Sequence, residues 1–129
     1  MFRPLNPAAI RPPFARYSHG VEVAAGHRLV LCSGQLGIAA DESVPEGAGA
    51  QAELCFKNIA AILGEAGLTL ASIVRINAFV TDRAYLRDYM AVRDRLFVDP
   101  LPASTLMIVS GFARPEFKVE IEAIAVGPV

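Results

Sequence analysis

The sequence predicts an α+β fold: a mixed sheet of about six strands with two helices on one of its faces. Apolar and polar residues alternate along residues 117–125, as in a strand with one buried face. Between Ala50 and Ala66 apolar residues recur at three- and four-residue spacing, as in an amphipathic helix. The 129 residues suffice for one domain, spanning 1–129, with its own hydrophobic core.

The sequence of the N-terminal part predicts an extended arm followed by a β-hairpin. Residues 1–16 are rich in proline and are expected to form an extended arm. A strand is expected from Tyr17 to Ala24, a turn at Ala25-Gly26, and a second strand over Arg28–Ser33 that is buried on both faces. Residues 34–38 are expected to end that strand, or to form a bulge beside a cleft.

Two helical patterns follow. The first, Ala50–Ala66, ends at Gly67, and Gln51 is expected on its solvent face. A strand is expected over Ser72–Val80, and a second helix from Thr81-Asp82 to about Phe97. The inner stripe of this second helix contains Tyr85, Tyr89, Val92 and Leu96, whereas its charged residues, including Arg93, are expected elsewhere on its surface.

The chain closes with two strand-like runs, residues 102–110 and 117–125, which we expect to pair. In the second run Phe117, Val119, Ile121, Ala123 and Ala125 should share the buried face. Lys118, Glu120, Glu122 and Ile124 should share the other.

Composition argues against several functional classes. The formal net charge is −1 and no basic run occurs, which argues against nucleic acid as a partner. The two cysteines lie in strand-like and helix-like runs without metal-ligand spacing, so no metal site is predicted. No apolar run is long enough to cross a membrane, and a cytoplasmic location is expected. The hydrophobic fraction of 53% favours self-association.

Several short motifs, in order, cover Tyr17 to Ala125 and resemble the RidA/YjgF family of reactive-intermediate deaminases, also named endoribonuclease L-PSP. They are Tyr17-Ser-His-Gly20, Ser33-Gly-Gln35, Gln51 with Asn58, Val74 to Asp82, Pro102-Ala103 and Val119 to Ala125. The resemblance implies a chorismate-mutase-like fold assembled as a homotrimer, with a small-molecule cleft between subunits. It also implies hydrolysis of enamines and imines to a carbonyl compound and ammonia, without metal or cofactor.

The resemblance also implies site residues. Glu120 would activate water, Tyr17 would wall the pocket, and Ser33 would lie on its rim. The deaminating branch has Pro-Ala-Arg-Ser where this chain has Pro102-Ala103-Ser104-Thr105, so Ser104 replaces an arginine that would bind a substrate carboxylate.

Further substrate-binding residues are expected around that position. Met90 stands where the same branch carries a cleft asparagine, which makes the pocket more apolar, and Leu106 is expected beside it. Arg114 and Arg16 are candidates to supply the missing positive charge.

Three functions stay open at this point. The first is an imine or enamine deaminase with a non-standard, mainly neutral or apolar substrate, and the second is a non-catalytic ligand-binding or regulatory trimer. The third, a ribonuclease or translation inhibitor, is disfavoured by the neutral charge and by the lack of a histidine pair.

Overall fold

A computed structural model describes all residues, 1–129, and confirms the α+β class with two helices and six strands. The strands and helices are β1 (Phe2–Leu5), β2 (Gly20–Val23), β3 (His27–Leu36), α1 (Ala48–Glu65), β4 (Ile73–Val80), α2 (Leu86–Leu96), β5 (Ala103–Ile108) and β6 (Val119–Pro128). Short 3₁₀ turns over Leu70–Ser72 and Arg83–Tyr85 precede β4 and α2.

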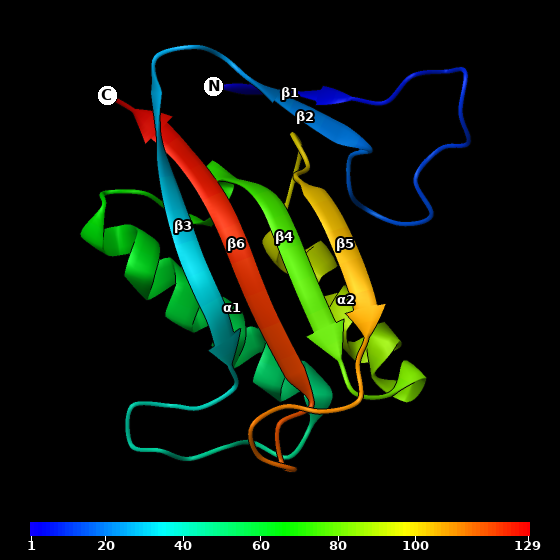
Figure 1. Cartoon of the computed structure of the whole chain (residues 1–129), viewed down its shortest axis with the longest axis vertical. Helices are drawn as coiled ribbons and strands as arrows, with labels where there is room; N and C mark the ends of the chain where they lie inside the picture. The colour runs from blue at the N-terminus through cyan, green and yellow to red at the C-terminus, as the bar shows by residue number, and fades with distance from the viewer.

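The strands form a four-stranded sheet in the order β3-β6-β4-β5 and a separate two-stranded sheet, β1-β2 (Figure 1). β6 is antiparallel to both β3 and β4, whereas β4 and β5 are parallel. The expected pairing of the last two strands is therefore wrong, because β4 lies beside both of them. β6 occupies a central position since its alternate residues Val119, Ile121, Ala123 and Ala125 are all buried, as predicted.

The predicted N-terminal hairpin is also wrong. The turn at Ala25-Gly26 is present, but β2 pairs with β1 and β3 pairs with β6. β2 has no buried residue, so it offers β3 no apolar face, whereas β6 offers a long one. β3 is thus an edge strand: Leu29 and Leu31 are 59% and 69% exposed instead of buried.

Residues 2–5 of the N-terminal segment form β1 and pair with β2, whereas a turn follows in which the Ile10 N–H donates to the carbonyl of Pro7 (3.4 Å). The loop between β1 and β2 returns to the main sheet at Ser18. The Ser18 backbone N–H donates to the carbonyl of Pro102 (2.9 Å) and its hydroxyl to the carbonyl of Leu101 (2.6 Å). These bonds hold Tyr17 beside the start of β5.

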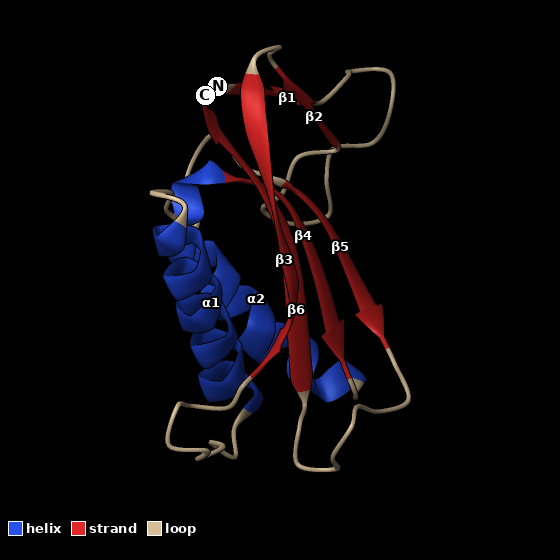
Figure 2. Cartoon of the chain, turned by 60° about the vertical axis from the view of Figure 1, so that its left-hand side comes forward, coloured by secondary structure: helices blue, strands red, loops and turns tan.

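Both helices cover one face of the four-stranded sheet (Figure 2). α1 ends as predicted at Gly67, whose φ of +73° is accessible to glycine at little cost. Its buried face differs from the expectation at Gln51, which is completely buried. The Gln51 side chain bonds backbone groups of two loops that lie far apart in sequence, so it fills a polar position in the core.

α2 follows a turn that Asp82 caps, where the carboxylate accepts a hydrogen bond from the N–H of Ala84 (2.8 Å). Tyr89 and Val92 are buried against the sheet, as expected. Arg93 is also buried, at 3% exposed, which corrects its predicted place on the outer surface. Arg93 lines a cavity together with Met90 of the same helix and with residues of the N-terminal loop, as described below.

No helix of this chain combines the length and the apolar character that a membrane crossing demands.

Candidate functional site

A cavity of about 350 Å³ lies between α2, the start of β5 and the loop that joins β1 to β2. Its lining consists of Phe14, Ala15, Tyr17, Met90, Arg93, Ser104, Thr105 and Leu106. Four of the residues predicted from the sequence as site residues therefore lie around one space: Tyr17, Met90, Ser104 and Leu106. We call this space the Tyr17 cavity.

The strand register explains why Ser104 and Leu106 face the cavity. Ser104 is paired with Ile76 of β4 and Leu106 with Ala78, and both β4 residues are buried on the helix side of the sheet. Paired residues of neighbouring strands share a face. Ser104 and Leu106 thus point toward α2, from which Met90 and Arg93 project at a spacing of three residues along one side of the helix.

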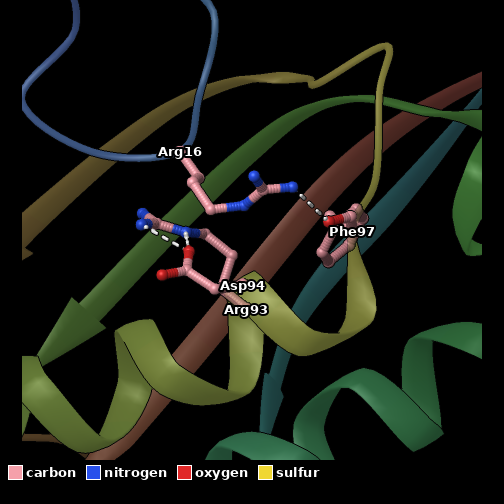
Figure 3. Close-up of polar contacts among 4 residues, drawn as sticks. All are labelled: Arg16, Arg93, Asp94 and Phe97. Atoms are coloured by element: carbon pink, nitrogen blue, oxygen red, sulfur yellow. Dashed lines mark hydrogen bonds and ion pairs between the residues drawn. The ribbon is translucent and has the colours of Figure 1, made fainter.

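Arg93 brings a buried positive charge to the cavity wall. Its side chain is 4% exposed, and its Nε and Nη2 donate to Oδ1 of Asp94 at 3.2 and 3.1 Å (Figure 3). Its carbon Cζ lies 5.8 Å from the ring centre of Tyr89. A guanidinium carries five N–H groups, so three of those of Arg93 have no acceptor within the chain.

Two hydroxyl groups beside Arg93 also lack partners. The oxygen atoms of Ser104 and Tyr89 are buried, and neither makes a hydrogen bond with acceptable geometry. Burial raises the pKa of Tyr89 far above its ordinary value, against smaller opposing effects of the Arg93 charge and the nearby Ser104 hydroxyl. The Tyr89 hydroxyl is therefore a neutral donor at physiological pH.

A second arginine covers the same part of α2. Figure 3 shows Arg16 extending from the N-terminal loop over the helix, with its Nη2 donating to the backbone carbonyl of Phe97 at 3.3 Å. Arg16 follows the cavity-lining Ala15 and precedes Tyr17. Arg16, predicted as a possible source of positive charge, thus lies close to the cavity without lining it.

Glu120 lies on the other face of the sheet. It is paired with Phe79 of β4, three positions along that strand from Ile76, the partner of Ser104. Because successive strand residues alternate between faces, an odd separation places Glu120 and Ser104 on opposite faces. Within one chain, Glu120 and the Tyr17 cavity are separate.

The carboxylate of Glu120 packs against the backbone of β3 at Gly34. A Cβ atom at Gly34 would lie 2.9 Å from Cδ and 3.0 Å from Oε1 of Glu120, so only glycine allows this contact. The predicted bulge occurs here, between Cys32 and Gln35, and it includes the exposed Ser33. We call Ser33, Gly34 and Glu120 the Glu120 surface.

The two carboxylates of β6 differ in their bonding. Glu122 accepts a hydrogen bond from Asn77 at 3.1 Å, whereas the Glu120 carboxylate, which is half-buried, accepts none from the chain. Glu120 also acts on Cys55 beneath it: burial and then the Glu120 charge raise the pKa of that thiol to about 12. Glu120 is therefore the carboxylate of this face that is free to bind water or a ligand.

Arg114 does not line the Tyr17 cavity. It is exposed on the loop between β5 and β6, where its Nε is 3.5 Å from Oε2 of Glu116 and its guanidinium lies 4.7 Å from the ring centre of Phe117. Arg93, which does line the cavity, was not predicted. Its spacing of three residues from Met90 was the available signal, but a charge on a short helix is usually solvated.

No group of three or more His, Cys, Asp or Glu side chains is arranged to hold a metal ion.

Comparison with known proteins places this geometry in context. The family model described as Endoribonuclease L-PSP matches residues 8–127. Protein DfrA of Myxococcus xanthus is 38% identical over 122 residues, covering 93% of this chain and 88% of DfrA. The 2-iminobutanoate/2-iminopropanoate deaminase of Salmonella typhimurium is 33% identical over 124 residues, covering 93% of this chain and 91% of the enzyme.

A solved structure extends the likeness to three dimensions. The Rid-family protein YyfB of Yersinia pestis, described as of unknown function, superimposes with a TM-score of 0.84 at 31% identity. The superposition covers 96% of this chain and 97% of YyfB.

Proposed function

The chain belongs to the RidA/YjgF (Endoribonuclease L-PSP) family, and from this premise we propose that it binds a small imine or enamine and hydrolyses it to a carbonyl compound and ammonia. The observation that carries the proposal is the Tyr17 cavity, which gathers Tyr17, Met90, Ser104 and Leu106 around one space. The deaminase name of the Salmonella relative supports the reaction class.

The complete site is formed between copies of the chain in a homotrimer, with the Tyr17 cavity of one subunit facing the Glu120 surface of the next. Two observations support this arrangement. Glu120 and Ser104 lie on opposite faces of the sheet, so one chain cannot bring them to the same ligand. Apolar side chains are left uncovered where a neighbour would pack, including Leu31 at 69% and Phe14, on the cavity rim, at 81% exposed.

The reaction uses water and the side chains of the chain. Glu120 accepts a proton from a water molecule as the water oxygen bonds to the carbon of the C=N group, and the electron pair of the π bond moves to nitrogen. Glu120 then returns this proton to nitrogen, takes up the proton of the new hydroxyl group and passes it to the same nitrogen, which becomes the leaving group. Ammonia departs as the C–N bond breaks and the carbonyl forms, so atoms and charge balance. An enamine first takes up a proton at carbon to become the imine.

The cavity sets the choice of substrate. Tyr17 and Leu106 offer apolar area, Met90 adds a flexible apolar side chain, and Ser104 offers a hydroxyl in place of a guanidinium. A hydroxyl cannot form the two parallel, charge-assisted bonds by which an arginine grips a carboxylate. The substrate therefore differs from that of relatives with an arginine at this position.

Ammonia release tests the proposal directly. Imines are generated in the assay by an amino-acid oxidase acting on a panel of amino acids with small polar and apolar side chains, and the rate of ammonia release is measured with and without the protein. We expect acceleration by the wild type and a loss of at least 100-fold in Glu120→Gln, because general acid–base groups typically contribute about 10²- to 10⁴-fold. Glu122→Gln is the matched control, since it changes the neighbouring carboxylate that Asn77 holds.

Other outcomes would point to the remaining functions. Binding of a metabolite without turnover, with equal affinity in Glu120→Gln, would make the chain a ligand-binding or regulatory protein. RNA cleavage that persists through repurification and is lost in Glu120→Gln would revive the ribonuclease function.

A further inference from the structure

We infer that Arg93 is the anion-binding residue of the Tyr17 cavity, holding a carboxylate of the ligand from α2 where Ser104 of β5 lacks the charge to do so. The inference rests on the proposed function in that it names a specificity-determining residue of the same cavity. It also assigns the ligand to a chemical class, small organic acids.

The first support is that Arg93 is desolvated without being fully bonded. Its side chain is 4% exposed, yet both of its hydrogen bonds go to one oxygen of Asp94. Three N–H groups of Arg93 remain without an acceptor in the chain. Because Arg93 lines the Tyr17 cavity, a ligand in that cavity is the acceptor available to them. A buried guanidinium with free donors is costly unless an acceptor reaches it, so the site is suited to an acceptor-rich ligand.

The second support is that Arg93 does not link separate parts of the structure. Its hydrogen-bond partner, Asp94, is the next residue of its own helix. A structural arginine would be expected to bond a loop or a second element, as the exposed Arg28 does through the carbonyls of Pro128 and Ala66. The position of Arg93 is therefore not explained by cross-linking.

The third support is the hydroxyl groups beside it. The buried oxygens of Ser104 and Tyr89 make no hydrogen bond within the chain. Ser104 lines the cavity together with Arg93, so this wall combines a cation with a hydroxyl group that can donate. A carboxylate has only acceptors, two oxygens with about four lone-pair directions, and matches such a set better than an amide or an alcohol does.

The local charge balance permits an anion. Asp94 is 39% exposed, so solvent screens it far more than it screens Arg93. Arg16 adds a second positive charge on the same side of α2 (Figure 3). An entering carboxylate thus meets Arg93 in the cavity wall, with the charges of Arg16 and Asp94 nearby.

A consequence follows for the substrate. With Arg93 on α2 rather than an arginine on β5, the carboxylate is held from the helix side of the cavity, beside Met90. The C=N group of the bound substrate must then occupy a different part of the cavity from the one it would occupy if an arginine at position 104 held the carboxylate. Replacing the arginine of β5 changes which acids fit without excluding acids.

Binding of two probes of equal size tests the inference without turnover. 2-Oxobutanoate and its neutral amide, 2-oxobutanamide, are titrated into the ¹⁵N-labelled protein, and Kd is obtained from amide chemical shifts. We expect the wild type to bind the acid at least tenfold more tightly than the amide, and Arg93→Gln to lose that preference. Arg93→Lys, which keeps the charge but not the fork of donors, should retain part of it.

Arg95→Gln is the matched control, because Arg95 is on the same helix but exposed and paired with Glu53. It should bind both probes as the wild type does. Equal affinity of the wild type for the acid and the amide, no binding of the acid at millimolar concentration, or an unchanged Kd in Arg93→Gln would each overturn the inference. If Arg93→Gln fails to fold, Arg93→Lys and the selectivity of the wild type still test the inference.

The two proposals fail in different ways. A protein that binds 2-oxobutanoate through Arg93 but releases no ammonia from any imine keeps this inference and loses the hydrolase function. Ammonia release that depends on Glu120 and is unaffected by Arg93→Gln, at all substrate concentrations, keeps the hydrolase function and rejects the role of Arg93.

Discussion

Replacing Gln51 with leucine removes a polar side chain that joins two distant loops inside the core. Gln51 is 0% exposed. Its Nε2 donates to the carbonyls of Pro45 and Glu116 at 2.8 and 2.9 Å, and its Oε1 accepts from the N–H of Lys118 at 2.8 Å. Leucine has nearly the same length, so the change removes three hydrogen bonds while leaving the packing volume almost unaltered.

The magnitude follows from these three bonds. Each contributes about 1 kcal/mol net, and a backbone group left without a partner costs more when water cannot reach it. We expect the free energy of unfolding to fall by about 2–4 kcal/mol, with Tm lower by roughly 10 °C for a chain of this size. Urea denaturation followed by circular dichroism at one protein concentration measures the change.

Gln35 provides the control for Gln51. Gln35→Leu alters a glutamine whose single side-chain bond, to the carbonyl of Ser33, is exposed, and should change the free energy by less than about 0.5 kcal/mol. If Gln51→Leu also changes it by less than about 1 kcal/mol, the three bonds do not stabilise the loops and the assigned role of Gln51 is wrong.

Two further predictions concern the Glu120 surface and pH. Gly34→Ala places a Cβ atom 2.9 Å from Cδ of Glu120, and the end of that side chain can move aside. We therefore expect ammonia release to fall at least tenfold while the free energy of unfolding changes by less than about 1 kcal/mol. The control is Gly64→Ala on α1, where an added Cβ meets no atom within 4 Å; equal activities of the two variants would contradict the role of the Glu120 contact. The second prediction follows from Cys55, whose pKa burial raises to about 12. Above a pH of about 9 the unfolded thiol loses its proton while the folded one keeps it, so the unfolded state binds fewer protons and stability declines as pH rises, by about 1.4 kcal/mol per pH unit for this thiol. Urea midpoints between pH 7 and pH 10 should show a shallower decline in Cys55→Ala, and identical slopes would refute the assignment.

Local sequence patterns were sufficient for the class of fold and for most element positions. The alternation along β6 required one buried face, and the spacing of apolar residues in α1 required a helix covering that face. Gly67 stops α1 because few other residues adopt its backbone conformation readily. Such signals depend on neighbours in sequence, so the sequence displays them directly.

Strand partners could not be predicted in the same way. Only three residues separate β2 from β3, and yet each pairs with a strand distant from that turn. Pairing is decided by which strand offers a long apolar face, which depends on the burial of the whole sheet. The exposed Leu29 and Leu31 on β3 are the result.

The candidate site shows the same division. Motifs along the sequence pointed to Tyr17, Met90, Ser104 and Leu106, and these lie around one cavity. The sequence could not tell that Glu120 is on the opposite face, because that depends on the registers of β4 with β5 and with β6. Nor could it tell that Arg93 is buried, because an arginine on a helix surface becomes a cavity residue only when a distant loop and strand enclose it. The residue types were determined by the sequence, whereas their grouping into a cation-bearing cavity was decided by tertiary packing.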